Sequence, residues 1–158
     1  MLYTGALVVA LFAVAPMRAQ TTMTLKTAPS GQVTSYTTTS MTFVPVDSTN
    51  LSYTVTIPTG YNLRMNAGNA TTAGSSANQA QIALFDASTA LTSTWIYAYS
   101  YWVPWALTWV IPGNGASHTI QLEYRANNSA YEAAIPYFTT QAQGTVAPVM
   151  TFLMAPTS

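Results

Sequence analysis

The stretch Thr119–Arg125 reads TIQLEYR, in which the apolar Ile120, Leu122 and Tyr124 alternate with four polar residues. Side chains of a β-strand point alternately to its two faces, so this period of two predicts a strand with one buried face and one solvent-facing face. A surface helix would instead repeat its apolar residues every three or four positions. The stretch is therefore expected to be a sheet element.

The same alternation recurs upstream of this stretch. Leu51–Ile57 reads LSYTVTI and Tyr61–Asn66 reads YNLRMN, each with apolar residues at every second position. Val149–Met154 is apolar almost throughout and is expected to be a last strand inside a sheet. Ala67–Gln79 is small, polar and low in complexity, so it is expected to be a long exposed loop.

Turn-forming clusters of Gly, Pro, Asn and Ser separate these strand patterns at fairly regular spacing. No stretch after residue 20 has a sustained helical period, so folds built from alternating strands and helices lack their crossover helices. We therefore expect one all-β domain over residues 21–158, an antiparallel jelly-roll sandwich of about eight strands. Residues 1–20 precede it as an apolar arm or a signal peptide.

Composition limits the function further. Charged residues make up 5% of the 158 residues, four basic against four acidic, where a typical soluble protein has roughly 25%. Nucleic acid and anionic membrane surfaces are excluded as partners, because binding either requires clustered Lys and Arg. The chain has no cysteine, which excludes disulfides and thiolate chemistry. Its polarity comes from hydroxyl and amide side chains, and such a surface suits a protein that packs against others.

Ala6–Pro16 reads ALVVALFAVAP, an apolar run too short to span a bilayer. As a signal peptide cleaved after Ala19 it would be imperfect, because Met17 occupies a small-residue position and the first five residues carry no Lys or Arg. If it is retained, it must be buried against its own domain, a neighbouring subunit or a scaffold protein. The anchoring side chains would be Leu7, Val8, Val9, Leu11, Phe12 and Val14.

An aromatic block is the most distinctive feature of the composition. Its members are Trp95, Tyr97, Tyr99, Tyr101, Trp102, Trp105 and Trp109. In a strand, the first four would share one face and Trp102 would take the other, so we expect core on one side and a subunit contact on the other. The alternative is glycan binding by stacked rings. Pro104 would end the strand or mark an edge, leaving a loop with Trp102 and Trp105 as the most exposed part.

Catalysis and metal binding have little support. His118 begins a strand directly after a Gly-rich turn, and a turn-stabilising or inter-strand hydrogen-bonding role is expected for it. Glu123 and Arg125 are expected to be a solvated pair on one wet face. Asp86 and Glu132 lack the spacing of a carboxylate dyad or a calcium loop. We expect no enzyme activity, no metal and no cofactor.

The stretch Trp109–Arg125, WVIPGNGASHTIQLEYR, resembles the penultimate-hairpin motif of trimeric jelly rolls of the tumour-necrosis-factor and complement-head type. Such domains occur in bacteriophage fibre and decoration proteins and in bacterial surface proteins. The chain departs from the pattern by two extra turn residues and by Asn127-Asn128-Ser129 where the family often has Gly-Gly. The residues that match are Pro112, Gly113, His118, Thr119, Ile120, Leu122, Tyr124 and Arg125.

This resemblance implies a homotrimer with a structural or receptor-facing role. We therefore expect a non-enzymatic structural protein on the surface of a phage virion, a decoration, cement or fibre-head subunit whose arm binds the capsid or another scaffold protein. One alternative is a secreted bacterial surface or fibre-forming protein. The other is a carbohydrate-binding module that uses the aromatic block to bind a host glycan.

Overall fold

The computed structural model describes residues 21–27, 35–71, 79–97, 103–135, 138–140 and 144–157. Within them the chain forms thirteen strands and no helix, so the predicted all-β class is confirmed. The strands are β1 (Thr22–Thr27), β2 (Tyr36–Thr38), β3 (Val44–Pro45), β4 (Ser52–Thr56), β5 (Tyr61–Thr71), β6 (Ala80–Asp86), β7 (Thr89–Ile96), β8 (Val103–Pro112), β9 (Ser117–Ala126), β10 (Ala133–Ile135), β11 (Phe138–Thr140), β12 (Gly144–Val146) and β13 (Val149–Pro156).

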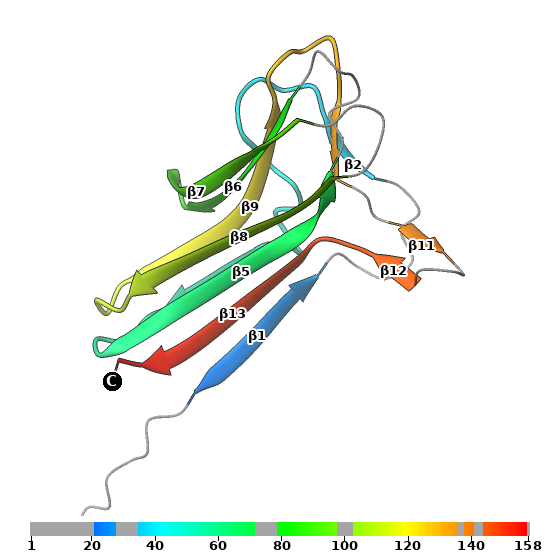
Figure 1. Ribbon diagram of the computed structural model, residues 1–158. Coiled ribbons are helices and arrows are strands. Elements are labelled where there is room, and N and C mark those ends of the chain that lie inside the picture. Colours follow the sequence, from blue (N-terminus) through cyan, green and yellow to red (C-terminus); the bar gives the residue numbers. More distant parts are fainter. Residues whose placement is uncertain are drawn as a thin grey trace, which may run out of the picture.

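Two antiparallel sheets form the sandwich (Figure 1). The first sheet has the order β1-β13-β5-β8, and in the second β9 lies between β6 and the edge strands β3 and β4, with β7 beyond β6. Eight of these strands pair in a nested order: β1 with β13, β4 with β9, β5 with β8, and β6 with β7. A long hairpin rolled up in this way is a jelly roll, as predicted. The predicted arm, residues 1–20, lies outside the described residues.

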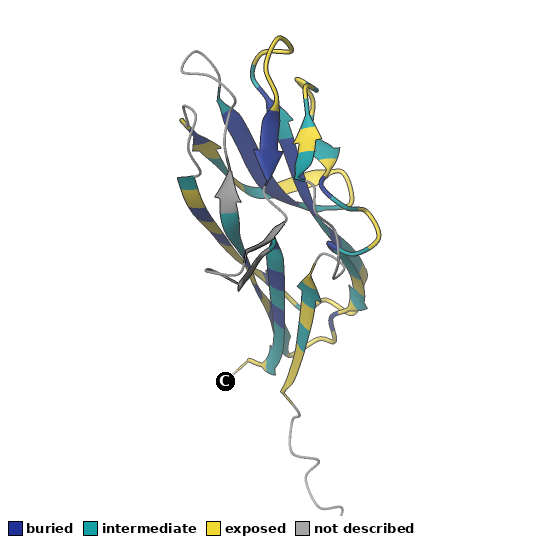
Figure 2. Cartoon of the chain, turned by 90° about the vertical axis from the view of Figure 1, so that its right-hand side faces the viewer, coloured by how far each residue is buried: buried dark blue, intermediate teal, exposed yellow. Residues whose placement is uncertain are grey.

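The core lies between the two sheets and is built by the alternation seen in the sequence. Ile120 and Leu122 of β9 are fully buried, and Leu63 of β5 is 1% exposed on the facing sheet. Figure 2 shows buried and exposed residues alternating along the strands. Phe152 of β13 packs on Tyr53 of β4 with ring centroids 4.6 Å apart, which joins the two layers. The apolar sides of the strands therefore meet each other.

Two elements bear directly on the predictions. β13 lies between β1 and β5, so Val149–Met154 is inside a sheet as expected. The predicted loop over Ala67–Gln79 is wrong in its first part, because β5 continues to Thr71 and Ala67 is 3% exposed. Pairing with β8 along the whole of β5 holds these small residues extended.

One end of the sandwich is closed by two interlocked turns. The backbone N–H of Gly113 donates to the Tyr61 carbonyl at 2.7 Å, and that of Gly115 donates to the Ile57 carbonyl at 2.9 Å. A Cβ at Gly113 would lie 2.0 Å from the Pro58 carbonyl oxygen, so only glycine fits. The turn after β8 is thus fixed against the turn before β5.

Asp47 organises the segment between β3 and β4. Its carboxylate accepts hydrogen bonds from the Thr49 and Asn50 backbone N–H groups, the Asn50 side-chain amide and the Tyr36 hydroxyl, at 2.8–3.0 Å. Burial by itself raises the pKa of Asp47, but the bonds from Asn50, Tyr36 and Thr49 outweigh it and leave the pKa below 3.8. The edge of the second sheet is therefore fixed by a charged, fully engaged side chain.

Candidate functional site

The outer face of the first sheet carries the residues that alternate with its core positions. An antiparallel sheet with a free outer face usually places polar residues there. Here Met23 is 73%, Leu25 58% and Val110 45% exposed, and Arg64 is the one charged residue among the three rows that follow. Across β1, β13, β5 and β8, the rows are Met23–Leu153–Arg64–Val110, Leu25–Thr151–Asn66–Thr108 and Thr27–Val149–Gly68–Ala106.

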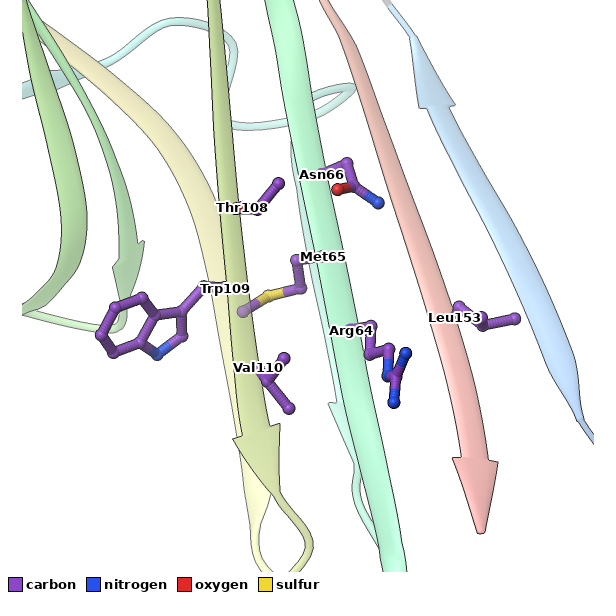
Figure 3. Close-up of a pocket in the computed structure, with 7 residues that line it drawn as sticks. All are labelled: Arg64, Met65, Asn66, Thr108, Trp109, Val110 and Leu153. Carbon is purple, nitrogen blue, oxygen red and sulfur yellow. The ribbon is translucent and has the colours of Figure 1, made fainter. Parts of the chain in front are cut away.

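An open hollow of about 570 Å³ lies on this outer face, and Arg64 is one of the residues that line it (Figure 3). Arg64 lies between Val110 of β8 and Leu153 of β13 in the strand register. Its guanidinium has no hydrogen-bond or ion-pair partner among the described residues. The complete lining is Arg64, Met65, Asn66, Thr108, Trp109, Val110 and Leu153. The hollow therefore combines apolar side chains with Asn66, Thr108 and a guanidinium that pairs with no described residue.

The two tryptophans of β8 differ in their surroundings. Trp105 is only 7% exposed, so the expectation that it lies in an exposed loop is wrong. Trp105 occupies an inward position of β8, and this strand continues through Pro104. An edge strand tolerates a proline because one side of its backbone has no partner strand that needs an N–H donor. Its indole nitrogen is buried and has no hydrogen-bond partner among the described residues. Trp109 also takes an inward position, yet it is 42% exposed.

The other members of the aromatic block divide between β7 and residues that the structure leaves undescribed. Trp95 lies on the outer face of the second sheet and is 36% exposed, while Ile96 points to the core and is 5% exposed. Tyr97 follows β7 and is 66% exposed. Tyr99, Tyr101 and Trp102 lie outside the described residues, so their predicted faces stay predictions.

Arg125 organises the outer face of the second sheet. Its guanidinium carbon lies 4.9 Å from the Phe43 ring centroid and 5.1 Å from that of Trp95. The guanidinium also donates to the Gln81 side-chain oxygen at 2.8 Å and to the Met41 carbonyl at 3.2 Å. Arg125 therefore fixes the segment around Phe43 onto the sheet through cation–π contacts and hydrogen bonds.

The predicted solvated pair of Glu123 and Arg125 is not found. Glu123 is 9% exposed and has no ion-pair or hydrogen-bond partner among the described residues, while Arg125 is committed to other groups. Burial raises the pKa of Glu123 above 4.5. The face is drier than alternation alone suggests, because Phe43, in the segment before β3, packs on Phe85 and Arg125, which flank Glu123 on this face.

His118 has the inter-strand role expected for it. Its Nδ1 lies 2.6 Å from a carboxylate oxygen of Asp86 on β6, and its Nε2 lies 3.4 Å from the side-chain oxygen of Asn114. The second carboxylate oxygen of Asp86 accepts a hydrogen bond from the Thr119 backbone N–H at 3.1 Å. These contacts hold the turn before β9 against the end of β6.

Neither a metal site nor a membrane-spanning helix is found in the part of the chain that the structure describes. It contains no group of three or more His, Cys, Asp or Glu side chains placed to hold a metal ion. It also contains no helix long and apolar enough to cross a membrane. The predicted anchoring residues Leu7, Val8, Val9, Leu11, Phe12 and Val14 lie outside the described residues.

The fold and its surfaces define a jelly-roll β-sandwich protein with a nearly uncharged outer sheet face. No protein-family model matches the chain, and no curated protein matches it. Among solved structures, it is similar to the crystal structure of the infectious bursal disease virus VP2 subviral particle, at 11% identity and a TM-score of 0.38. That match covers 95% of this chain and 42% of the VP2 chain, so the chain spans less than half of the VP2 chain.

The sequence reasoning missed the outer face of the first sheet as a candidate site. A signal was present in β13, whose sequence VMTFLM is apolar at both of its alternating sets of positions. A central strand with apolar side chains on both sides needs a cover on both sides. Met23 and Leu25 in the Thr-rich β1 extend the same surface to the edge of the sheet.

Proposed function

We propose that this protein is a non-enzymatic structural subunit that assembles with copies of itself as a homotrimer. Its place is the surface of a phage particle, as a decoration, cement or fibre-head protein. The observation that carries the proposal is the outer face of the first sheet, where Met23, Leu25 and Val110 are exposed around a single charge. A face of this kind is stable in water when another protein surface covers it.

Copies of the same chain are suitable partners for this face. Its side chains are apolar, hydroxyl or amide apart from Arg64, so two copies meet with little electrostatic repulsion. Each Å² of apolar surface removed from water contributes about 25 cal/mol, and this term increases as more copies share the contact. Three copies around one axis is the arrangement that the resemblance of Trp109–Arg125 to trimeric jelly rolls implies.

The arm over residues 1–20 would join the domain to a neighbouring subunit or to a scaffold protein of the particle. Its run Ala6–Pro16 carries no charged residue, so burial is its available source of binding energy. A secreted bacterial surface protein that loses residues 1–19 is the alternative. Mass spectrometry of the mature chain distinguishes the two, since retention of the arm supports the particle proposal.

A paired substitution tests self-association through the outer face. Met23→Lys with Leu25→Lys places two further charges per copy on this face in β1, and we expect the mass measured by light scattering to fall from three chains to one. Thr56→Lys is the control, because Thr56 is an exposed residue of an edge strand in the second sheet. A parent chain that is monomeric, or a double variant that remains trimeric, would overturn the proposal.

Glycan binding is the second candidate, favoured by the exposure of Tyr97 at 66% beside Trp95 at 36%. Aromatic rings at the surface can stack on sugars while nearby hydroxyl and amide groups donate hydrogen bonds. Tyr97→Ala is expected to abolish binding on a glycan array. Trp109→Ala is the control, since Trp109 belongs to the first sheet, and binding that ignores Tyr97→Ala removes this candidate.

A further inference from the structure

β8 is an edge strand of the first sheet that lies near β7 without pairing with it. The order of the first sheet ends at β8, which pairs with β5 alone in that sheet. Pro104 and Pro112 lie near its two ends, and the seven residues of Trp105–Ile111 between them all keep their backbone N–H groups. No strand among the described residues pairs with the side of this segment that faces away from β5. Edge strands in this state are templates for pairing with another extended chain.

Trp109 is the exposed exception among the inward-facing side chains of β8. Its register partner Met65 is 2% exposed, and Leu107 and Ile111, which share its side of β8, are 4% and 8% exposed. Trp109 itself is 42% exposed, although its indole lies on the same inward side of the strand, opposite Thr108 and Val110 (Figure 3). A strand added beside β8 would cover this ring and pair with the free backbone groups.

We propose that the Trp105–Ile111 edge of β8 accepts the apolar arm of a second copy of this chain as an added strand. The inference deepens the proposed function, because it names the acceptor of the arm, and it rests on that function. The occupant is Leu7–Val14, LVVALFAV, in which valine and phenylalanine are good strand formers. Seven paired residues extend over about 23 Å.

Composition favours this occupant over a charged peptide. Neither Trp105–Ile111 nor Ala6–Pro16 contains a charged residue, so no charge is desolvated when the two segments pair. Alternate side chains of the added strand would lie beside Trp109 on the inner side. The others would lie beside Thr108 and Val110, next to the hollow around Arg64.

The geometry favours the arm of another copy over that of the same chain. The arm joins the domain at β1, which is the opposite edge of the first sheet from β8, three strand spacings or about 14 Å away. In the register of the sheet, Thr22 lies at the same end as Ile111. An arm that returned to its own β8 would therefore run parallel to β8, whereas every pair in this sheet is antiparallel.

Disulfide trapping in the full chain tests the proposal, because the natural sequence has no cysteine. Thr108→Cys is made in a chain with a size tag, and Ala10→Cys or Leu11→Cys in an untagged chain, because the middle of Leu7–Val14 lies opposite the middle of Trp105–Ile111 in either strand direction. We expect a disulfide-linked dimer of one tagged and one untagged chain. Its yield should be several times higher from one of the two arm positions than from the other, because neighbouring residues of a strand face opposite sides. Thr56→Cys, an exposed threonine on the β4 edge, replaces Thr108→Cys in the control and is expected to give no link.

Three results would overturn the proposal. One is cross-linking at Thr108 no stronger than at Thr56. Another is a chain with Leu11→Cys and Thr108→Cys that closes only on itself, which would place the arm on its own β8. The last is a mature chain whose mass lacks residues 6–16. Failure here stays distinct from failure of the proposed function, because the light-scattering test of the outer face does not involve the arm.

Discussion

Gly113 decides whether the two turns at one end of the sandwich can interlock. Gly113→Ala puts a methyl group 2.0 Å from the Pro58 carbonyl oxygen and 2.8 Å from that of Tyr61, so the backbone must move. We expect a loss of about 2–3 kcal/mol in the free energy of unfolding, measured by urea denaturation. Gly60→Ala is the matched control, because Gly60 has a φ of +84° and open space around it, and we expect about 1 kcal/mol there. Equal losses at the two sites would contradict this account.

Glu123 makes stability depend on pH in the direction opposite to most carboxylates. Burial raises its pKa in the folded chain above 4.5, so the stability that its neutral form contributes is present below that pH and is lost as pH rises through the raised pKa. Glu123→Gln stays neutral, and we expect its unfolding free energy to exceed that of the parent increasingly from pH 4.5 to 7. Parallel stability curves for the two proteins would show that Glu123 is not responsible.

Asp47 is expected to give the opposite dependence of stability on pH. Its pKa lies below 3.8 in the folded chain, so its contribution is present above that pH and is lost as pH falls through the lowered pKa. Asp47→Asn is therefore expected to be destabilised at neutral pH and to approach the parent in acid. Thermal melting at a series of pH values measures both variants.

At the scale of elements, β1 is the least firmly held strand of the first sheet. None of its six side chains is buried, and it pairs with β13 alone. In dilute monomer we expect the amide hydrogens of β1 to exchange at least about tenfold faster than those of β5, as measured by mass spectrometry. If copies cover Met23 and Leu25, the protection of β1 should rise with protein concentration. Equal protection of β1 and β5 in the monomer would contradict the prediction.

The elements that could be predicted are those whose burial follows simple alternation. The patterns at Leu51–Ile57 and Thr119–Arg125 correspond to β4 and β9, and Val149–Met154 lies in an inner strand. The ends of elements were less predictable: β5 continues through small residues because its neighbours pair with it, a tertiary effect. The burial of Glu123 depends on the segment around Phe43, which packs on the same face and which no local pattern reveals.

At the scale of the whole molecule, the low charge of the outer face predicts how assembly responds to salt. Arg64 is the single charged residue in the three rows of this face, so screening changes little when copies meet. Between about 0.05 and 0.5 M salt, we expect the association constant to change by less than about threefold. Sedimentation equilibrium measures it, and a steep decline with salt would indicate that charged groups elsewhere hold the copies together.

The candidate site was predictable only in part, because it depends on which strands are neighbours. Composition indicated a surface suited to packing, but the alignment of Leu25 with Thr108 across four strands follows from register and not from either segment alone. The aromatic block is distinctive in the sequence because its aromatic residues lie close together. The structure buries Trp105 in the core and leaves Trp109 at an edge.

The pairing of β1 with β13 has a consequence for biosynthesis. A ribosome delivers Thr22–Thr27 long before its hydrogen-bonding partner Val149–Met154 exists, so the first sheet cannot close until β13 has emerged. Such distant pairings fold slowly, in milliseconds to seconds. During that delay the nascent chain exposes β1 and its apolar neighbours, a period in which chaperones would protect it from premature contact with other chains.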